Sequence, residues 1–169
     1  VRVFSNPRLS AAAGSIFVAF FCLFGFTFLV TQYFQFVRGY DTLSAGIHTI
    51  PFAVGAGVTA PFAARAALRF GTKRVVAMGL LNMAIGLAIA SRMDQHSSYW
   101  GHVIISMVIM ANGLSLVTSP STDAIMGTLN RDKAGVGSAI NDVGREVGGT
   151  LGVAIVGSVF VSLYTPKLA

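Results

Sequence analysis

The hydrophobic positions of the chain fall in five long runs, separated by short polar or glycine-containing segments. A helix rises about 1.5 Å per residue, so about 20 apolar residues cross a hydrocarbon core about 30 Å thick. The pattern therefore predicts an all-α, integral membrane bundle of five transmembrane helices. We expect these spans at about 9–37, 44–68, 74–92, 99–128 and 137–163.

The composition favours the same class. Of the 169 residues, 54% are hydrophobic and 11% are charged, whereas about a quarter of the residues in a soluble domain are charged. This excludes a disordered chain and an ordinary cytosolic enzyme. The single cysteine, Cys22, cannot form an internal disulfide.

The net charge of +6 is explained by the loops, without a nucleic-acid partner. One set of alternate loops carries eight basic residues: Arg2, Arg8, Arg65, Arg69, Lys73, Arg74, Arg131 and Lys133. The other set carries Arg38, Arg92 and Lys167. Because Lys and Arg gather in cytoplasmic loops, we expect a multi-pass protein of the cell membrane, inner or plasma, with a cytoplasmic N-terminus and an external C-terminus. We therefore expect the lipid bilayer to be one of its partners.

Three ionisable residues, Asp142, Arg145 and Glu146, lie on one side of the fifth predicted span. Each charge costs about 2.5–3.5 kcal/mol on insertion scales, so each requires a reason. Two interpretations stay open. The cluster is either a static ion pair that holds helices together or a proton-coupled gate.

The same span carries a stripe of small residues, Gly144, Gly148 and Gly152. Glycines four residues apart allow the backbone of another helix to approach closely. The stripe predicts a helix-packing seam. Four apolar residues lie on the opposite side of this helix and are expected to face lipid: Val143, Val147, Leu151 and Ala154.

Polar residues inside the first and fourth spans are candidates for lining a cavity. These are Thr31, Gln32, Gln35, Asn112 and Ser115. In the fourth span, Asn112 and Ser115 begin a stripe that continues through Ser119 and Thr122. Such a stripe fits an aqueous cavity and interhelical hydrogen bonding equally well.

The sequence has no enzyme signature. It has no P-loop, no GxSxG and no HExxH. The histidines at positions 48, 96 and 102 have no metal-ligand spacing. We therefore expect no enzymatic activity, no cofactor and no metal.

Three segments resemble the major facilitator superfamily. The segment Ala64–Arg74, with Arg65, Arg69, Gly71, Lys73 and Arg74, resembles its cytoplasmic G-x-L-x-D-R-x-G-x-[RK]-R motif, with Ala64 and Leu68 replacing the Gly and the Asp. Residues 35–40, followed by Ala45, Gly46 and Pro51, look like the outer junction of its seventh and eighth helices. Residues 134–154 are similar to the eleventh core helix of its fourteen-span drug:proton antiporters.

The resemblance implies that residues 1–169 are a partial C-terminal domain, core helices seven to eleven, of a larger exporter. The implied function is proton-coupled export of drugs or other lipophilic or cationic small molecules. The implied partners are that substrate, protons and a missing N-terminal half. The alternative is a non-transporting membrane remnant or a small membrane interaction protein.

Overall fold

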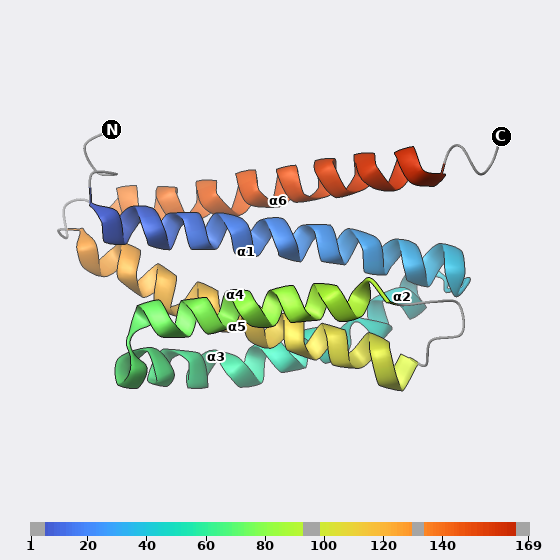
Figure 1. The fold of residues 1–169 in the computed structure, drawn as a ribbon, viewed down its shortest axis with the longest axis horizontal. Coiled ribbons are helices and arrows are strands. Elements are labelled where there is room, and N and C mark those ends of the chain that lie inside the picture. The colour runs from blue at the N-terminus through green and yellow to red at the C-terminus, as the bar shows by residue number, and fades with distance from the viewer. Residues whose placement is uncertain (1–5, 93–98, 130–133, 165–169) are drawn as a thin grey trace.

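The computed structural model of the chain describes residues 6–92, 99–129 and 134–164, which form a bundle of long helices (Figure 1). The elements are α1 (Pro7–Gln32), the π-helical turn η2 (Tyr33–Val37), α2 (Thr42–His48), α3 (Ile50–Phe70), α4 (Thr72–Ala90), the π-helical turn η3 (Tyr99–Val103), α5 (Ile104–Thr128) and α6 (Ala134–Tyr164).

Five helical segments within the described ranges are long and apolar enough to cross a membrane. They are Pro7–Val37, Thr42–Phe70, Thr72–Ala90, Gly101–Thr128 and Ala134–Ser162. The five predicted spans are thereby confirmed, with ends that differ by a few residues.

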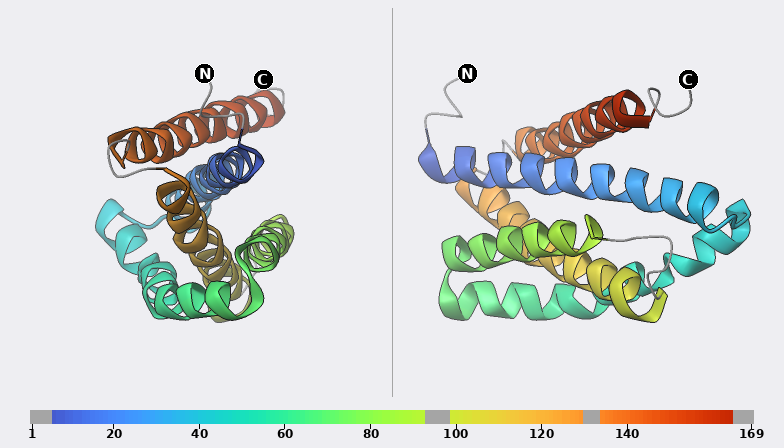
Figure 2. Two further views of the ribbon diagram at one scale, coloured as in Figure 1. Left: turned by 90° about the vertical axis from the view of Figure 1, so that its left-hand side faces the viewer. Right: turned by 45° about the vertical axis from the view of Figure 1, so that its right-hand side comes forward.

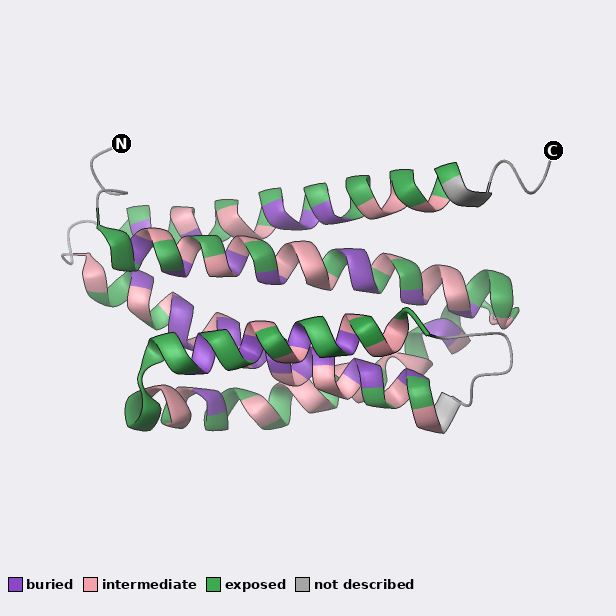
Figure 3. Cartoon of the chain, in the orientation of Figure 1, coloured by how far each residue is buried: buried purple, intermediate pink, exposed green. Residues whose placement is uncertain are grey.

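Helix α5 lies at the centre of the bundle. It packs along α4 and α3 and also contacts α1 and α6, while α6 packs along α1 (Figures 1 and 2). Buried residues accordingly follow α5 over most of its length (Figure 3). The outer faces of α3, α4 and α6 expose large apolar side chains such as Val58, Leu81 and Val143, as expected for a surface that meets lipid.

The second span is interrupted where a single helix was expected. Proline at position 51 has no N–H group and cannot continue the hydrogen-bond ladder from α2. The chain turns instead at Thr49, whose hydroxyl donates to the carbonyl of Gly46 at 2.7 Å, and α3 starts at Ile50. The short helix α2 is thus set off from α3 at one end of the bundle.

A single residue, Gly71, separates α3 from α4. Its φ of +86° and ψ of 142° lie in a region that residues with a Cβ rarely adopt. The second glycine of the resembled loop motif is therefore explained by the tight reversal between the two helices.

The described basic residues follow the predicted asymmetry. Arg8 lies in the first turn of α1, Arg65 and Arg69 lie near the end of α3, and Lys73 and Arg74 lie at the start of α4. All belong to the end of the bundle at which α1 and α4 begin (Figure 1). Arg38 and Arg92 belong to the other end. Four further basic residues lie outside the described ranges: Arg2, Arg131, Lys133 and Lys167.

Candidate functional site

The predicted glycine seam of α6 packs against α1, and its three glycines are not equivalent. A Cβ atom at Gly148 would overlap the carbonyl oxygen of Phe17, and one at Gly152 would overlap that of Phe21. At Gly144, a Cβ atom would lie 3.4 Å from the nearest side-chain atom, an ordinary contact. Only the second and third glycines of the stripe are required by backbone contact.

A second seam joins α4 to α5 and was not identified from the sequence. A Cβ atom at Gly79 would lie 2.8 Å from the carbonyl oxygen of Gly113, and one at Gly113 would lie 2.7 Å from that of Gly79. Two turns further along α4, Gly86 lies against the backbone of Met110. The available signal was the seven-residue spacing of the two α4 glycines, which places them on one helix face.

The three charged residues of α6 are not joined in this conformation. Arg145 is half-buried and turns toward α1, where its guanidinium carbon lies 5.1 Å from the ring centroid of Phe20. Asp142 and Glu146 are exposed. No ion pair links the three in the described part of the chain, and the buried Nε of Arg145 has no hydrogen-bond partner.

The neighbour of the Arg145 charge is the ring of Phe20, where the sequence suggested a carboxylate. A guanidinium over a ring is attracted by about 0.5–2 kcal/mol, depending on its exposure to solvent. This is comparable with a partly exposed ion pair. In this conformation the partner of the guanidinium is the Phe20 ring on α1 and not a carboxylate of its own helix.

The polar stripe of α5 forms interhelical hydrogen bonds, one of the two alternatives that the sequence left open. The hydroxyl of Thr59 on α3 donates to the side-chain oxygen of Asn112. The hydroxyl of Ser115 donates to the carbonyl of Ala56 on α3 at 3.0 Å. Further along, Thr122 faces α6 and donates to Asn141 at 3.4 Å.

The cavity-lining candidates of the first span lie toward the other end of α1. The hydroxyl of Thr31 donates to the carbonyl of Thr27 in its own helix at 2.8 Å. Gln32 is half-buried, and Gln35 is exposed in η2. Within the residues that the structure describes, no hydrogen bond brings this group together with Asn112 or Ser115.

The junction between α1 and α2 is an aromatic cluster. The ring of Tyr40 lies 5.8 Å from that of Phe34 and 4.5 Å from that of His48. Asp41 caps α2 beside this cluster and accepts a hydrogen bond from the Ser44 amide at 3.3 Å. Hydrogen bonding from Ser44 lowers the pKa of the Asp41 carboxyl.

The basic residues of the resembled loop motif are exposed. The Arg65 guanidinium lies 5.9 Å from the ring of Phe62, and that of Arg69 lies 5.5 Å from the ring of Phe70. On α4, Arg74 is exposed, while Lys73 lines a pocket.

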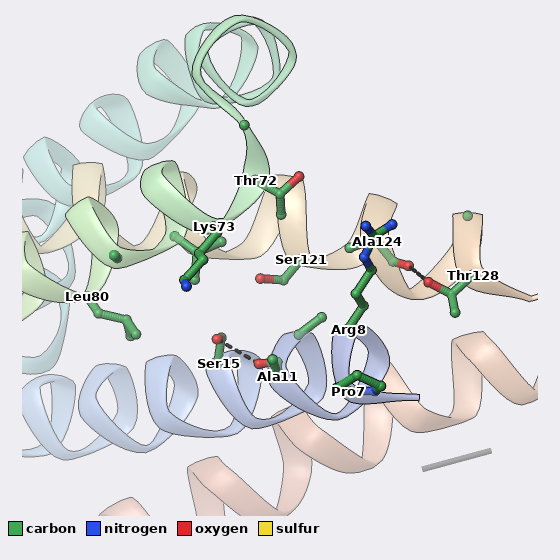
Figure 4. Close-up of a pocket in the computed structure, with 15 residues that line it drawn as sticks. Pro7, Arg8, Ala11, Ser15, Thr72, Lys73, Leu80, Ser121, Ala124 and Thr128 are labelled. Carbon is green, nitrogen blue, oxygen red and sulfur yellow. Dashed lines mark hydrogen bonds between the residues drawn. The ribbon is translucent and has the colours of Figure 1, made fainter. Parts of the chain in front are cut away.

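This pocket, of about 1000 Å³, lies between the first turns of α1 and α4 and the last turns of α5 (Figure 4). Arg8 and Lys73 stand at its walls, with apolar residues of α1 and α4 between them. Ser121 of α5 also lines it, and the buried Oγ of that residue has no hydrogen-bond partner. No pattern in the sequence predicts this site, because its residues come from three helices and share no linear motif.

Comparison with known proteins identifies the architecture. Residues 15–169 match the model of the Major Facilitator Superfamily. Multidrug resistance protein Stp of Mycobacterium tuberculosis is 28% identical over 168 residues, 99% of this chain and 31% of Stp. Multidrug efflux pump LfrA of Mycolicibacterium smegmatis is 29% identical over 148 residues, 88% of this chain and 29% of the pump. Methyl viologen resistance protein SmvA of Salmonella typhimurium is 29% identical over 160 residues, 93% of this chain and 32% of SmvA.

The chain therefore spans about a third of the length of the curated relatives that it matches. The names of the first two denote multidrug resistance or multidrug efflux, and that of the third denotes resistance to methyl viologen.

Proposed function

The chain belongs to the Major Facilitator Superfamily, and we propose that it forms part of a transporter that exports drugs or other lipophilic or cationic small molecules in exchange for protons. The names of its relatives support this class of substrate. The partner that completes the transporter is an N-terminal half, because alternating access needs two halves that rock about a site between them. We assign the assembly to the cell membrane, with the end that carries Arg8 and Lys73 in the cytoplasm.

The observation that carries this proposal is the exposed polar face of α6. Asp142 and Glu146 lie one turn apart, exposed, on a helix that is long enough to cross a membrane. Charged carboxylates are not stable against lipid, so this face requires protein or water opposite it. The neighbouring face is apolar, with Val143, Val147 and Leu151 exposed, and is suited to lipid. The polar face is then the surface on which a second half docks.

Arg145 links this face to the interior. When Asp142 and Glu146 are ionised, they compete with the Phe20 ring for the guanidinium. Protonation removes that competition and favours the contact between Arg145 and α1. Since the two kinds of contact have similar strength, neutralising the carboxylates is enough to shift the balance. In this proposal the cluster acts as a gate.

The substrate cavity is assigned to the polar residues of the first span, Thr31, Gln32 and Gln35, together with Asn112 and Ser115 of α5. The two α5 residues must then exchange their hydrogen bonds with α3 for bonds with substrate or water.

The test is ethidium efflux from cells that express the full transporter containing this chain. We expect the double substitution Asp142→Asn with Glu146→Gln to abolish proton-dependent efflux. The control is Asp41→Asn, which removes a carboxylate outside the spans. Unchanged efflux in the double variant would exclude the gate.

A second arm expresses the chain with and without a matching N-terminal half. Efflux only on coexpression supports a two-part exporter. No efflux in either case, with both pieces inserted in the membrane, would overturn the transport proposal and favour the non-transporting alternative.

A further inference from the structure

We propose that the pocket between α1, α4 and α5 binds a phosphate group, carried either by an anionic phospholipid or by a soluble phosphate ester. This site is distinct from the charged face of α6 and from the polar candidates for the substrate cavity. Its occupancy is measurable without transport, so the proposal does not rest on drug export.

The charge of the pocket favours an anion. Arg8 and Lys73 come from two different helices and both line it. No Asp or Glu is among the described residues of its wall. Arg and Lys are the usual ligands of phosphate, and their hydrogen bonds to it are charge-assisted.

The N-terminus of α4 adds to this charge, whereas in α1 Pro7 has no N–H group and the Arg8 amide already donates to the Asn6 side chain at 3.0 Å. The lining includes Pro7, with which α1 starts, and Thr72, with which α4 starts. The N-cap of α4 is Gly71, so no side chain occupies the free N–H groups of that first turn. Exposed N–H groups and the positive end of the helix dipole form a favourable environment for phosphate. The last turn of α5 opposes them, but there the hydroxyl of Thr128 already donates to the carbonyl of Ala124 at 2.6 Å.

Ser121 provides independent evidence of a ligand. Its side chain is fully buried at the wall of the pocket, and its Oγ has no partner. Figure 4 shows this oxygen directed into the same space as the Lys73 nitrogen and the Ser15 hydroxyl. Buried hydroxyls almost always have a hydrogen-bond partner. A phosphate oxygen between α1 and α4 supplies the missing acceptor.

The remaining wall suits an amphiphile. Val76, Ala77 and Leu80 continue the pocket along α4 beyond Lys73. The charged end lies at the helix starts and the apolar end lies deeper in the span. This order matches a phospholipid, whose phosphate sits at the membrane surface and whose chains enter the hydrocarbon.

The proposal is tested on the purified full chain in detergent, by following maleimide labelling of Cys22 during heating. Three probes are titrated separately: dihexanoyl phosphatidylglycerol, dihexanoyl phosphatidylcholine and glycerol phosphate. Stabilisation by phosphatidylglycerol alone identifies a lipid site. Stabilisation by glycerol phosphate identifies a soluble ester. Either result supports the proposal, and stabilisation by none of the probes, or equally by phosphatidylcholine, overturns it.

Variants show whether the pocket is the site. We expect Arg8→Gln and Lys73→Gln each to weaken the affinity for the stabilising probe about tenfold. We expect Ser121→Ala to weaken it about fivefold, the effect of one hydrogen bond. The matched control is Arg74→Gln, which removes an exposed cation adjacent to Lys73 but outside the pocket, and it should change the affinity less than twofold.

Ser121→Ala keeps the test independent of folding defects. Without ligand, this substitution removes a buried hydroxyl that has no partner, so the labelling midpoint should not fall. A variant set in which the pocket substitutions and Arg74→Gln have the same affinity would overturn the assignment of the site.

Discussion

Replacing Gly152 by alanine is expected to separate α6 from α1. The added Cβ atom would lie 3.1 Å from both the carbonyl carbon and the Cα atom of Phe21, and closer still to its carbonyl oxygen. Ordinary contacts of a Cβ atom begin at 3.4 Å. These neighbours are backbone atoms, which cannot rotate away as a side chain does. The helices must therefore move apart locally by about half an ångström to one ångström.

The size of the effect follows from the contacts that this movement weakens. A gap of about 0.5–1 Å removes a quarter to a half of the attraction of each atom pair across it. Summed over a close helix crossing, the loss is about 1–3 kcal/mol, the usual range for overpacking. Alanine also stabilises a helix interior relative to glycine by about 1 kcal/mol, so a control must share that gain.

The matched control is Gly157→Ala, also inside α6. There the new Cβ atom would lie 3.6 Å from the ring of Phe28, an ordinary contact. We expect Gly152→Ala to be less stable than this control by about 1–3 kcal/mol. Gly148→Ala should behave like Gly152→Ala, and Gly144→Ala should behave like the control.

The assay uses Cys22, the single cysteine, which is half-buried on α1. A maleimide dye labels it as the bundle opens, and the midpoint temperature of labelling reports stability. We expect a midpoint several degrees lower for Gly152→Ala than for Gly157→Ala. Equal midpoints for the two variants would refute the backbone contact between α1 and α6.

Three further predictions concern hydrogen bonds and turns. A double-mutant cycle of Thr59→Val and Asn112→Leu, measured by the same labelling midpoint, should give a coupling of about 0.6 kcal/mol, and a coupling of zero would mean that α3 and α5 are not joined there. Gly71→Ala should lower stability by about 1–3 kcal/mol because of its positive φ, and a midpoint equal to that of the wild type would contradict the turn. Hydrogen bonding from Ser44 lowers the pKa of Asp41. The carboxylate therefore contributes fully to the stability of α2 at a pH above the ordinary aspartate pKa. It loses that contribution as the pH falls through the lowered pKa. Hydrogen exchange at the Ser44 amide should report this loss as faster opening in the wild type, with no such change in Asp41→Ala.

Local chemistry was enough to predict the spans and the candidate packing surfaces. A helix that crosses a membrane must be long and apolar along its own sequence, so the five spans could be predicted without knowledge of their neighbours. The α6 stripe of Gly144, Gly148 and Gly152 and the apolar face that includes Val143 could also be predicted, because each is a pattern within a single helix.

Contacts between helices decided the remainder. Glycine spacing marks a face of a helix but does not give the distance to the neighbouring backbone, so only the packed structure distinguishes Gly144 from Gly148 and Gly152. The stripe that begins with Asn112 and Ser115 fits a cavity or a hydrogen-bonded seam until the position of α3 is known. The charged residues of α6 share one side of the helix by sequence, yet packing turns Arg145 toward Phe20 and leaves the carboxylates outside.

The sequence by itself determined that this is a membrane bundle of five spanning helices, because the cost of exposing backbone and charge to lipid acts on each segment separately. Only the tertiary structure decided which polar groups have partners. Arg8, Lys73 and Ser121 are far apart in the chain and line one pocket because α1, α4 and α5 converge at one end of the bundle. A site of that kind depends on the packing of several helices, so no sequence pattern within one segment predicts it.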